Sequence, residues 1–539
     1  MDSTKLCLSH NAGLQARLDD LKNKIHHDKL LERTKQNPIW LHFGSGNIFR
    51  AYIADIAQTL LLKHKMQEGI IACDTYDDEI IDKIYKENDG ISLSAILHTD
   101  GNIETKLIAS IAQSCNFNAD KEDRATIVDY CKNPKLQIIT FTVTEKAYTL
   151  KNKDGEYLQA IKDSLNKPLE EANHIIPAIV YLLHERYLSC KQGISLLALD
   201  NCFHNGDRLK AAVMEIAKAY EERHQVDADF ISYLTSGKVA FPLSMIDKIV
   251  PRPSTQIRDY LKGEGVLGVD IIKTQKGSFA ASFVNSEPIG YLAIEDNFPN
   301  GRPLLEEAGA IICPRETVML CENMKIESCL NPLQTALAIY GKLLSYNLIS
   351  DCMQDNLLKT LVERLGDEGI KVVEDPKVID PKHFLNEALK ERLPNPYIYD
   401  SPSRIATDTS EKIKVRCALT INKYRKLHLK TDSLIAVKLV IAGFIRYLAE
   451  IDDSGKSFEL SADPQLDYLK SMGAKLNISD PTDPTSQQVI DELIHNQELI
   501  GTDLCVDGLD IQIKEMIQKM CMGPGSIKEV LSLYLGKAN

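Results

Sequence analysis

The sequence predicts two domains, an α/β domain with a parallel sheet followed by a largely α-helical domain. Short apolar strands alternate with helical segments in the first part of the chain, and strand signals nearly vanish after about residue 302. The length of 539 residues also exceeds what one hydrophobic core usually serves. We therefore predict domains at 1–301 and 302–539, connected through the Pro- and Gly-containing segment EDNFPNGRP (295–303).

The predicted strands of the first domain are four apolar runs, 39–44, 69–74, 136–143 and 193–200. Between the first two, Ile48, Tyr52, Ile56 and Leu60 recur at helical spacing, and residues 176–190 give another helix before the fourth strand. This alternation predicts crossover helices, and hence parallel strands.

The second domain is predicted from its helical periodicity, at 332–346, 353–365, 412–424, 431–449, 485–498 and 508–520. The longest apolar stretch, LIAVKLVIAGFI (434–445), contains Lys438 and is too short to span a bilayer. We expect it to be a buried helix.

Composition excludes several classes of protein. A hydrophobic content of 44% with 26% charged residues is ordinary for a folded protein, and the net charge of -13 gives no reason to expect nucleic acid or an anionic membrane as a partner. The 13 cysteines include no C-x-x-C motif, which favours reduced thiols over disulfides or a metal site, and the N-terminus lacks a basic-then-apolar signal. We expect a cytoplasmic protein without a metal, and a monomer.

The first strand is followed by GSGNIF, which places Gly44 and Gly46 at the spacing that lets a backbone turn approach a pyrophosphate at a helix N-terminus. Phe49 replaces the third glycine of the usual pattern, so the helix cannot pack as closely on the sheet there. A turn that needs two glycines for its geometry alone is the alternative interpretation.

Asp74 ends the next predicted strand, where a carboxylate can accept the ribose hydroxyls of NAD. Asp77 and Asp78 add negative charge that would repel a 2′-phosphate, which favours NAD over NADP. Together with the glycine turn, this predicts a Rossmann-like dinucleotide-binding domain. The alternative for Asp74 is an ordinary exposed turn residue.

In the second domain, Asn331 followed by Pro332 has the pattern of a helix N-cap with proline at the first helical position. Gln334 is placed to complete a capping box. A cap alone is a sufficient explanation of Asn331 at this point.

Five segments together resemble the mannitol dehydrogenase family of long-chain polyol dehydrogenases. They are HFGSGNIFRAY (42–52), TVTEKAY (142–148), LALDNCFHNG (197–206), FPLSMIDKIVP (241–251) and IEDNFPNGRP (294–303). The resemblance implies an enzyme that interconverts ketoses or keto-uronates with polyols or aldonates using a nicotinamide cofactor. The implied cofactor contacts are Gly44, Gly46, Asn47, Ile48, Asp74 and Thr144.

The resemblance also implies a catalytic core of Lys325, Asn331 and Asn201. Oxidation of a secondary alcohol needs a base for the hydroxyl proton and donors for the developing alkoxide, and the reverse reduction needs an acid and the same donors. A lysine serves near neutral pH only if its pKa falls well below its usual value of about 10.4. This chemistry requires no metal.

Five further residues match places in the family pattern. Glu322 would be a gating or proton-relay carboxylate, with a surface ion pair to Lys325 as the alternative. Arg404 and Lys412 would bind the substrate, with a solvated basic face as the alternative. Asp247 and Lys248 match an acidic–basic pair to which we assign no role.

Two departures from the family affect the substrate prediction. The interval from Lys325 to Asn331 is one residue longer than in the family, and Gln334 stands where the family has a histidine. We expect Gln334 to bind the substrate, because glutamine can still donate a hydrogen bond to a substrate oxygen, although it carries no proton in the physiological range. We expect an NAD-dependent oxidoreductase of a hexuronate, converting fructuronate to mannonate or tagaturonate to altronate. The alternatives are a mannitol 2-dehydrogenase, acting on mannitol and fructose, and a non-catalytic homologue that binds a sugar acid or nucleotide.

Overall fold

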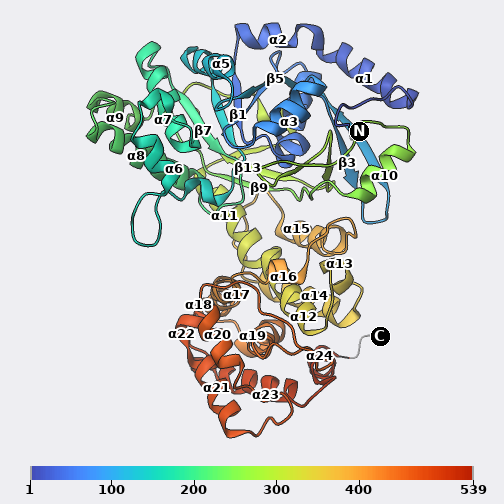
Figure 1. Ribbon diagram of the computed structural model, residues 1–539. Coiled ribbons are helices and arrows are strands. Elements are labelled where there is room, and N and C mark those ends of the chain that lie inside the picture. Colours follow the sequence, from blue (N-terminus) through green and yellow to red (C-terminus); the bar gives the residue numbers. More distant parts are fainter. Residues whose placement is uncertain (1–2, 537–539) are drawn as a thin grey trace. The chain divides into compact units, whose positions relative to one another are not determined.

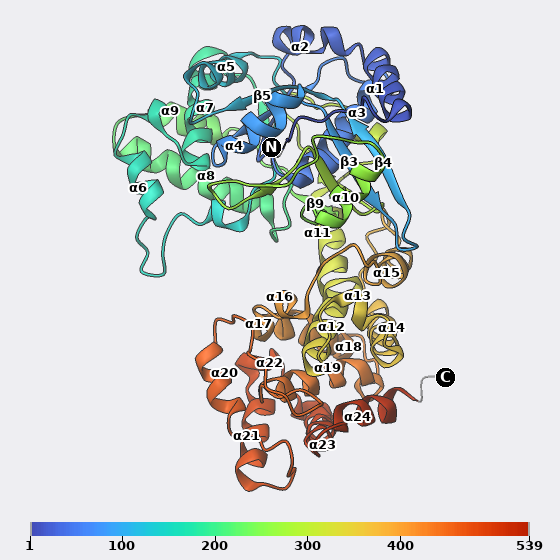
Figure 2. The same ribbon diagram turned by 45° about the vertical axis from the view of Figure 1, so that its right-hand side comes forward.

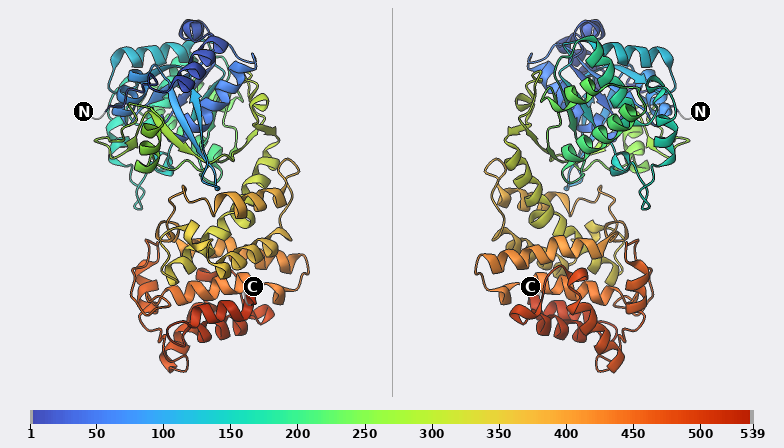
Figure 3. Two further views of the ribbon diagram at one scale, coloured as in Figure 1. Left: turned by 90° about the vertical axis from the view of Figure 1, so that its right-hand side faces the viewer. Right: turned by 90° about the vertical axis from the view of Figure 1, so that its left-hand side faces the viewer.

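The computed structural model describes residues 3–536. Contacts divide the chain into two units, Met1–Leu97 with Asn102–Met319, and His98–Gly101 with Leu320–Asn539. The first unit is coloured blue through green in Figure 1 and the second mostly yellow through red, and Figure 3 shows both from two opposite sides. The predicted boundary at 301/302 lies earlier than this division, because strand β14 (Ile311–Cys313) still pairs with β13 (Tyr291–Glu295) of the first unit.

The main sheet of the first unit has six parallel strands in the order β5-β2-β1-β6-β7-β8. This is the strand order of a Rossmann fold, in which ligands bind at the carboxyl edge where the order reverses. The four predicted strands are confirmed as β1, β2, β6 and β7. The bounds are β1 Trp40–Phe43, β2 Ile70–Asp74, β5 Ile111–Asn116, β6 Ile138–Phe141, β7 Ile194–Ala198 and β8 Val239–Ala240.

The two faces of this sheet differ because side chains alternate along each strand. Leu41 and Phe43 of β1 face an apolar core shared with helices α5, α7 and α8. On the other face, Trp40 Nε1 donates to Thr140 Oγ1 at 2.8 Å, and a ring nitrogen of His42 shares the same hydroxyl at 2.8 Å.

Smaller sheets complete the unit, in the orders β12-β3-β4, β14-β13-β9 and β10-β11. Their remaining bounds are β3 Ser92–Leu97, β4 Ile103–Ile108, β9 Ser244–Asp247, β10 Ile272–Lys273, β11 Phe279–Ala280 and β12 Phe283–Ser286.

The helices of the first unit surround the main sheet, as Figure 1 shows. The α-helices are α1 Ala12–Ile25, α2 His27–Gln36, α3 Ala54–Leu62, α4 Asp78–Ile80, α5 Lys121–Lys132, α6 Gln159–Leu165, α7 Ile175–Ser189, α8 Asn205–Glu222, α9 Ala228–Thr235 and α10 Thr255–Gly263. Two π-helical turns, η1 Phe49–Ile53 and η2 Ile81–Tyr85, and the 3-10 turns η3 Lys86–Asn88, η4 Glu145–Tyr148, η5 Leu169–Glu171 and η6 Leu305–Ala308 lie between them.

From α11 onward, the named secondary-structure elements within the described residues are all helices, joined by loops and turns, which confirms the predicted architecture. Helices α12, α14 and α19 pack against one another, and Figure 2 labels them together. The α-helices, the first of which begins before the unit boundary, are α11 Arg315–Asn323, α12 Asn331–Leu343, α13 Ile349–Cys352, α14 Asn356–Ile370, α15 Pro381–Glu387, α16 Pro402–Ile405, α17 Thr409–Ile413, α18 Leu419–Lys426, α19 Ile435–Tyr447, α20 Leu466–Gly473, α21 Pro484–His495, α22 Gln497–Ile500, α23 Leu509–Met520 and α24 Ser526–Leu535. The π turns η7 Met324–Cys329, η8 Ala388–Arg392 and η9 Lys414–Ala418, with the 3-10 turns η10 Thr431–Ser433 and η11 Cys505–Asp507, link them.

The apolar run at 434–445 is the buried helix that we predict. Every residue of α19 from Ala436 to Tyr447 is buried, and the Lys438 ammonium donates to the Asp432 carbonyl at 2.9 Å and to the Gln512 side chain. Across residues 3–536, the structure contains no helix with both the length and the apolar character that crossing a membrane requires.

Candidate functional site

The glycine turn after β1 lies at the carboxyl edge of the main sheet, between β2 and β6. Gly44 has φ +97°, and a Cβ there would approach the Thr142 carbonyl oxygen to 2.3 Å, so only glycine fits. A Cβ on Gly46 would meet nothing within 4 Å. The space beside Gly46 is therefore open, as the approach of a pyrophosphate requires.

Asp74 fastens this turn to the end of β2. Its carboxylate accepts the backbone N–H groups of Ser45 at 3.0 Å, Tyr76 at 2.7 Å and Asp77 at 3.1 Å. Burial raises the pKa of Asp74, and these N–H groups oppose that shift. The alternative of an exposed turn residue is wrong, because Asp74 is only 8% exposed.

Phe49, which replaces the third glycine, stacks on His42 with ring centroids 4.0 Å apart. The helix after the turn starts as the π turn η1, and Asn47 Oδ1 accepts from the buried Arg50 at 2.9 Å. Burial lowers the pKa of His42 to about 3, so the imidazole is neutral at physiological pH. The stacked rings of Phe49 and His42 thus fill the space between η1 and β1 that close packing at a third glycine would leave out.

A second loop, after β7, carries Asn201. Asp200 Oδ1 accepts the Cys202 N–H at 3.0 Å, and Oδ2 accepts the Tyr148 hydroxyl from the loop after β6. Asn201 lies between these anchored neighbours and is exposed, as is Thr144 in the loop after β6. The two loops present these side chains at the carboxyl edge of adjacent strands.

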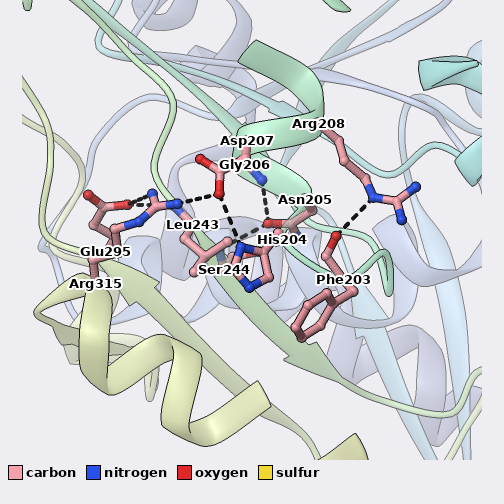
Figure 4. A network of polar contacts seen from close by, with 10 residues as sticks. All are labelled: Phe203, His204, Asn205, Gly206, Asp207, Arg208, Leu243, Ser244, Glu295 and Arg315. Carbon is pink, nitrogen blue, oxygen red and sulfur yellow. Dashed lines mark hydrogen bonds and ion pairs between the residues drawn. The ribbon is translucent and has the colours of Figure 1, made fainter. Parts of the chain in front are cut away.

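The polar network in Figure 4 holds the residues that follow Asn201. Asn205 Nδ2 donates to the Ala198 and Asp200 carbonyls, each at 3.2 Å, and Asn205 Oδ1 accepts the Ser244 N–H at 3.1 Å. Arg315 bonds to both Asp207 and Glu295. Asn205, Asp200 and Tyr148 support this loop and were not identified from the sequence, although the Asn-Gly pair at 205–206 is a turn signal.

Asp247 is buried, and Lys248 makes contacts with neighbouring segments of the first unit. Asp247 is 3% exposed within β9, and the Lys248 ammonium donates to the Glu287 carbonyl at 2.6 Å. The same ammonium lies 5.4 Å from the centre of the Tyr52 ring. These contacts attach β9 to its neighbours.

Lys325 of the helical unit lies in the π turn η7. The Leu330 N–H bonds to the Lys325 carbonyl, five residues earlier, at 3.3 Å. A π turn accommodates one residue more than an α-turn, so it takes up the six-residue interval from Lys325 to Asn331. Such turns are frequent at functional sites.

The predicted N-cap at Asn331 is wrong. The chain enters α12 directly from η7, so Leu330 occupies the cap position and no side chain caps the helix. The predicted capping box with Gln334 is therefore absent as well, and the Gln334 N–H bonds to the Leu330 carbonyl at 3.1 Å. Within residues 3–536, the side-chain amides of Asn331 and Gln334 have no hydrogen-bond partner, and both residues are half-buried.

Arg416, which our sequence analysis did not identify, contacts the start of α12. Its Nη1 donates to the Asn331 carbonyl at 2.9 Å and to the Thr335 hydroxyl. Burial lowers the pKa of Arg416 to about 10, so the guanidinium keeps its charge. A fixed positive charge therefore adjoins Asn331.

Lys412 and Arg404 extend this positive region. Burial, with the nearby Arg416 and Arg404, lowers the pKa of Lys412 to about 8. The Lys412 ammonium donates to the Ile405 carbonyl at 2.7 Å and to the Thr407 carbonyl. Arg404 is paired with Asp400 through Nε at 2.6 Å and Nη2 at 2.5 Å, and its side chain is 71% exposed.

Glu322, on α11, is 5% exposed. The Glu322 carboxylate is therefore buried and does not lie at the surface, while its relation to Lys325 stays a prediction.

Family models match both parts of the chain. The mannitol dehydrogenase Rossmann domain covers residues 38–307, and the mannitol dehydrogenase C-terminal domain covers residues 317–520. A D-mannonate oxidoreductase of Thermotoga maritima is 42% identical over 514 residues, which are 95% of this chain and 95% of that protein.

Two solved structures share the fold. One, a D-sorbitol dehydrogenase in substrate-free form, has a TM-score of 0.76 and 21% identity over 92% of this chain and 95% of that chain. The other, the ternary complex of Pseudomonas fluorescens mannitol 2-dehydrogenase with NAD and D-mannitol, has a TM-score of 0.66 and 23% identity over 93% and 94%. From the two family-model matches and the Thermotoga relative, the chain belongs to the mannitol dehydrogenase family of oxidoreductases.

Proposed function

We propose that this protein is an NAD-dependent oxidoreductase that interconverts a keto-hexuronate and its aldonate, fructuronate and mannonate first, with tagaturonate and altronate as the close alternative. The observation that carries the proposal is the positive group of Arg404, Lys412 and Arg416, of which Arg416 contacts the start of α12, because a uronate brings a carboxylate that such a group attracts. The 42% identity to a D-mannonate oxidoreductase supports the same substrate class.

The residues at the glycine turn fit a dinucleotide. The strand order, the open space beside Gly46 and the carboxylate of Asp74 meet the requirements of pyrophosphate and ribose. Asp77 and Asp78 disfavour a 2′-phosphate, which supports NAD over NADP. The residues proposed to hold NAD are Gly44, Gly46, Asn47, Ile48, Asp74 and Thr144.

In the proposed reaction, bound NADH supplies the hydride. Lys325 donates its Nζ proton to the oxygen that becomes the hydroxyl, and takes that proton back in the oxidation. The amides of Asn331 and Asn201 donate hydrogen bonds to the same oxygen as it gains negative charge. The absence of a capping bond leaves the Asn331 amide available for this role.

One observation favours a neutral substrate instead. Because Asp400 already pairs with Arg404, part of the positive charge is neutralised before any substrate binds. Mannitol and fructose are therefore the second candidate pair.

The decisive experiment follows NADH absorbance on addition of fructuronate, tagaturonate or fructose, with Lys325→Ala as the control. We expect rapid oxidation with a uronate and little in the variant. Faster turnover of fructose would establish the second candidate. NADH binding with no turnover on any of the three would overturn the enzymatic proposal and favour a binding protein altered by Gln334.

A further inference from the structure

Three side chains capable of binding a metal converge on the surface of the helical unit. They are His495 at the end of α21, Cys505 at the start of η11 and Asp510 in the first turn of α23, and their ligand atoms all lie within 4.8 Å of one another. None of them belongs to the proposed catalytic or substrate-binding residues. The group forms no motif in the sequence because three separate elements bring it together.

Two of the three distances between these atoms match edges of a zinc tetrahedron, and the third, from His495 to Cys505, is at most 4.8 Å. His495 Nε2 lies 3.4 Å from Asp510 Oδ2, and Cys505 Sγ lies 3.6 Å from the same oxygen. In tetrahedral zinc sites the metal lies about 2.0–2.2 Å from nitrogen or oxygen and about 2.3 Å from sulfur. Those bond lengths give ligand separations of about 3.4 Å for nitrogen and oxygen and about 3.6 Å for sulfur and oxygen.

The arrangement is held in place without a metal. Helix α21 packs on α23, and the contact of His495 with Asp510 joins the C-terminal end of one helix to the N-terminal turn of the other, where the helix dipole of α23 favours the Asp510 carboxylate. The His495 and Asp510 side chains are 47% and 20% exposed, so an ion has access from solvent. Cys505 is the one cysteine within residues 3–536 that is exposed.

We propose that His495, Cys505 and Asp510 bind a zinc ion, with water in the fourth position. On binding, the Cys505 thiol releases its proton to solvent, and the thiolate and the carboxylate together balance the two positive charges of the ion. The metal would connect the end of α21 to the start of α23 across α22. We therefore expect it to stabilise the helical unit and to take no part in hydride transfer.

The test uses the full-length protein, freed of metal with a chelator and titrated with Co²⁺ as a spectroscopic substitute for zinc. We expect one cobalt per chain and the thiolate-to-cobalt absorption of a bound cysteine. Cys505→Ser should abolish that absorption and His495→Ala should weaken binding sharply. The half-buried Cys190 offers a matched control, and Cys190→Ser should leave the absorption unchanged.

Thermal unfolding gives a second readout, independent of activity. Zinc should raise the melting temperature of the parent protein by about 2 °C or more at saturating concentration, because it binds only the folded state, and should not raise that of Cys505→Ser. Absence of cobalt binding in the folded parent, or absorption that persists in Cys505→Ser, would overturn the proposal.

Discussion

Asn331 contributes its backbone to the first turn of α12, while its side-chain amide takes no part in capping that helix. We predict that Asn331→Ala changes the free energy of unfolding by less than about 0.5 kcal/mol, whereas loss of a true N-cap costs about 1 kcal/mol. If the amide stabilises the substrate oxygen, kcat should fall about 10²- to 10³-fold. Urea unfolding and steady-state kinetics on the same preparation check both values.

Asp380 provides the matched control, because it also precedes a proline but does cap its helix. Its carboxylate accepts the N–H groups of Lys382 and His383 at the start of α15. Asp380→Ala should destabilise the protein by about 1 kcal/mol and leave kcat unchanged. If Asn331→Ala instead destabilises the protein and keeps its kcat, Asn331 has a structural role and not a catalytic one.

Lys412 should make uronate binding depend on pH. With its pKa lowered to about 8, the ammonium is charged below that pH and neutral above it. The KM for fructuronate should therefore rise as the pH passes about 8, while the KM for uncharged fructose should change much less. Kinetics from about pH 6 to about pH 10 test this, and Lys412→Arg, which keeps its charge, should show a flat profile. Equal pH profiles for both substrates would exclude Lys412 as the carboxylate contact.

At the scale of elements, the two glycines of the turn after β1 have different roles, because we expect Gly44 to be needed for folding and Gly46 for cofactor binding. Gly44→Ala should destabilise the α/β unit by about 2 kcal/mol or more, because the new methyl group would clash with the Thr142 carbonyl at a positive φ. Gly46→Ala should leave stability within about 0.5 kcal/mol, because its Cβ meets nothing, yet should weaken NADH binding. Thermal unfolding and NADH fluorescence titration distinguish the two variants. Unchanged NADH affinity in Gly46→Ala would place the cofactor elsewhere.

Elements with strong local signals were predictable from the sequence. The strands β1, β2, β6 and β7 are buried apolar runs, and α12, α19 and α23 have clear helical spacing. Strands such as β8 and β10 contain two residues each, too few for a periodic pattern to show. The π turn η7 was not predicted, because the backbone hydrogen bond from the Leu330 N–H to the Lys325 carbonyl does not change the spacing of apolar residues in the sequence.

At the scale of the whole molecule, the residues of the glycine turn could be named from the sequence because they follow a strand directly. Arg416 could not, because its contacts with Asn331 and Thr335 depend on how η9 packs against α12. The same limit applies to Tyr148 and Asp200, which join the loops of two adjacent strands. A site residue can thus be identified from its neighbours in the sequence, whereas the residues that hold it in place depend on tertiary packing.

The stability of the α/β unit should depend on the buried His42, whose pKa is lowered to about 3. An unfolded histidine titrates near pH 6.5, so between about pH 6.5 and about pH 3 the unfolded chain binds the extra proton. The contribution of neutral His42 to the free energy of unfolding is therefore complete above about pH 6.5. It falls by up to about 1.4 kcal/mol per pH unit as the pH decreases from about 6.5 to about 3. Fluorescence of Trp40, the single tryptophan of the chain, reports unfolding of this unit from the same strand.

We predict that His42→Gln lowers the stability at neutral pH but flattens its dependence on pH between about 6.5 and about 4.5, because glutamine has no proton to gain. His10→Gln, at an exposed histidine of the same unit, should keep the slope of the parent protein. Urea unfolding followed by Trp40 fluorescence at several pH values measures the three slopes. If the slopes of the parent protein and His42→Gln coincide, His42 does not limit stability in acid. Other groups, such as the half-buried His174 with its pKa lowered to about 4, would then have to account for the pH dependence.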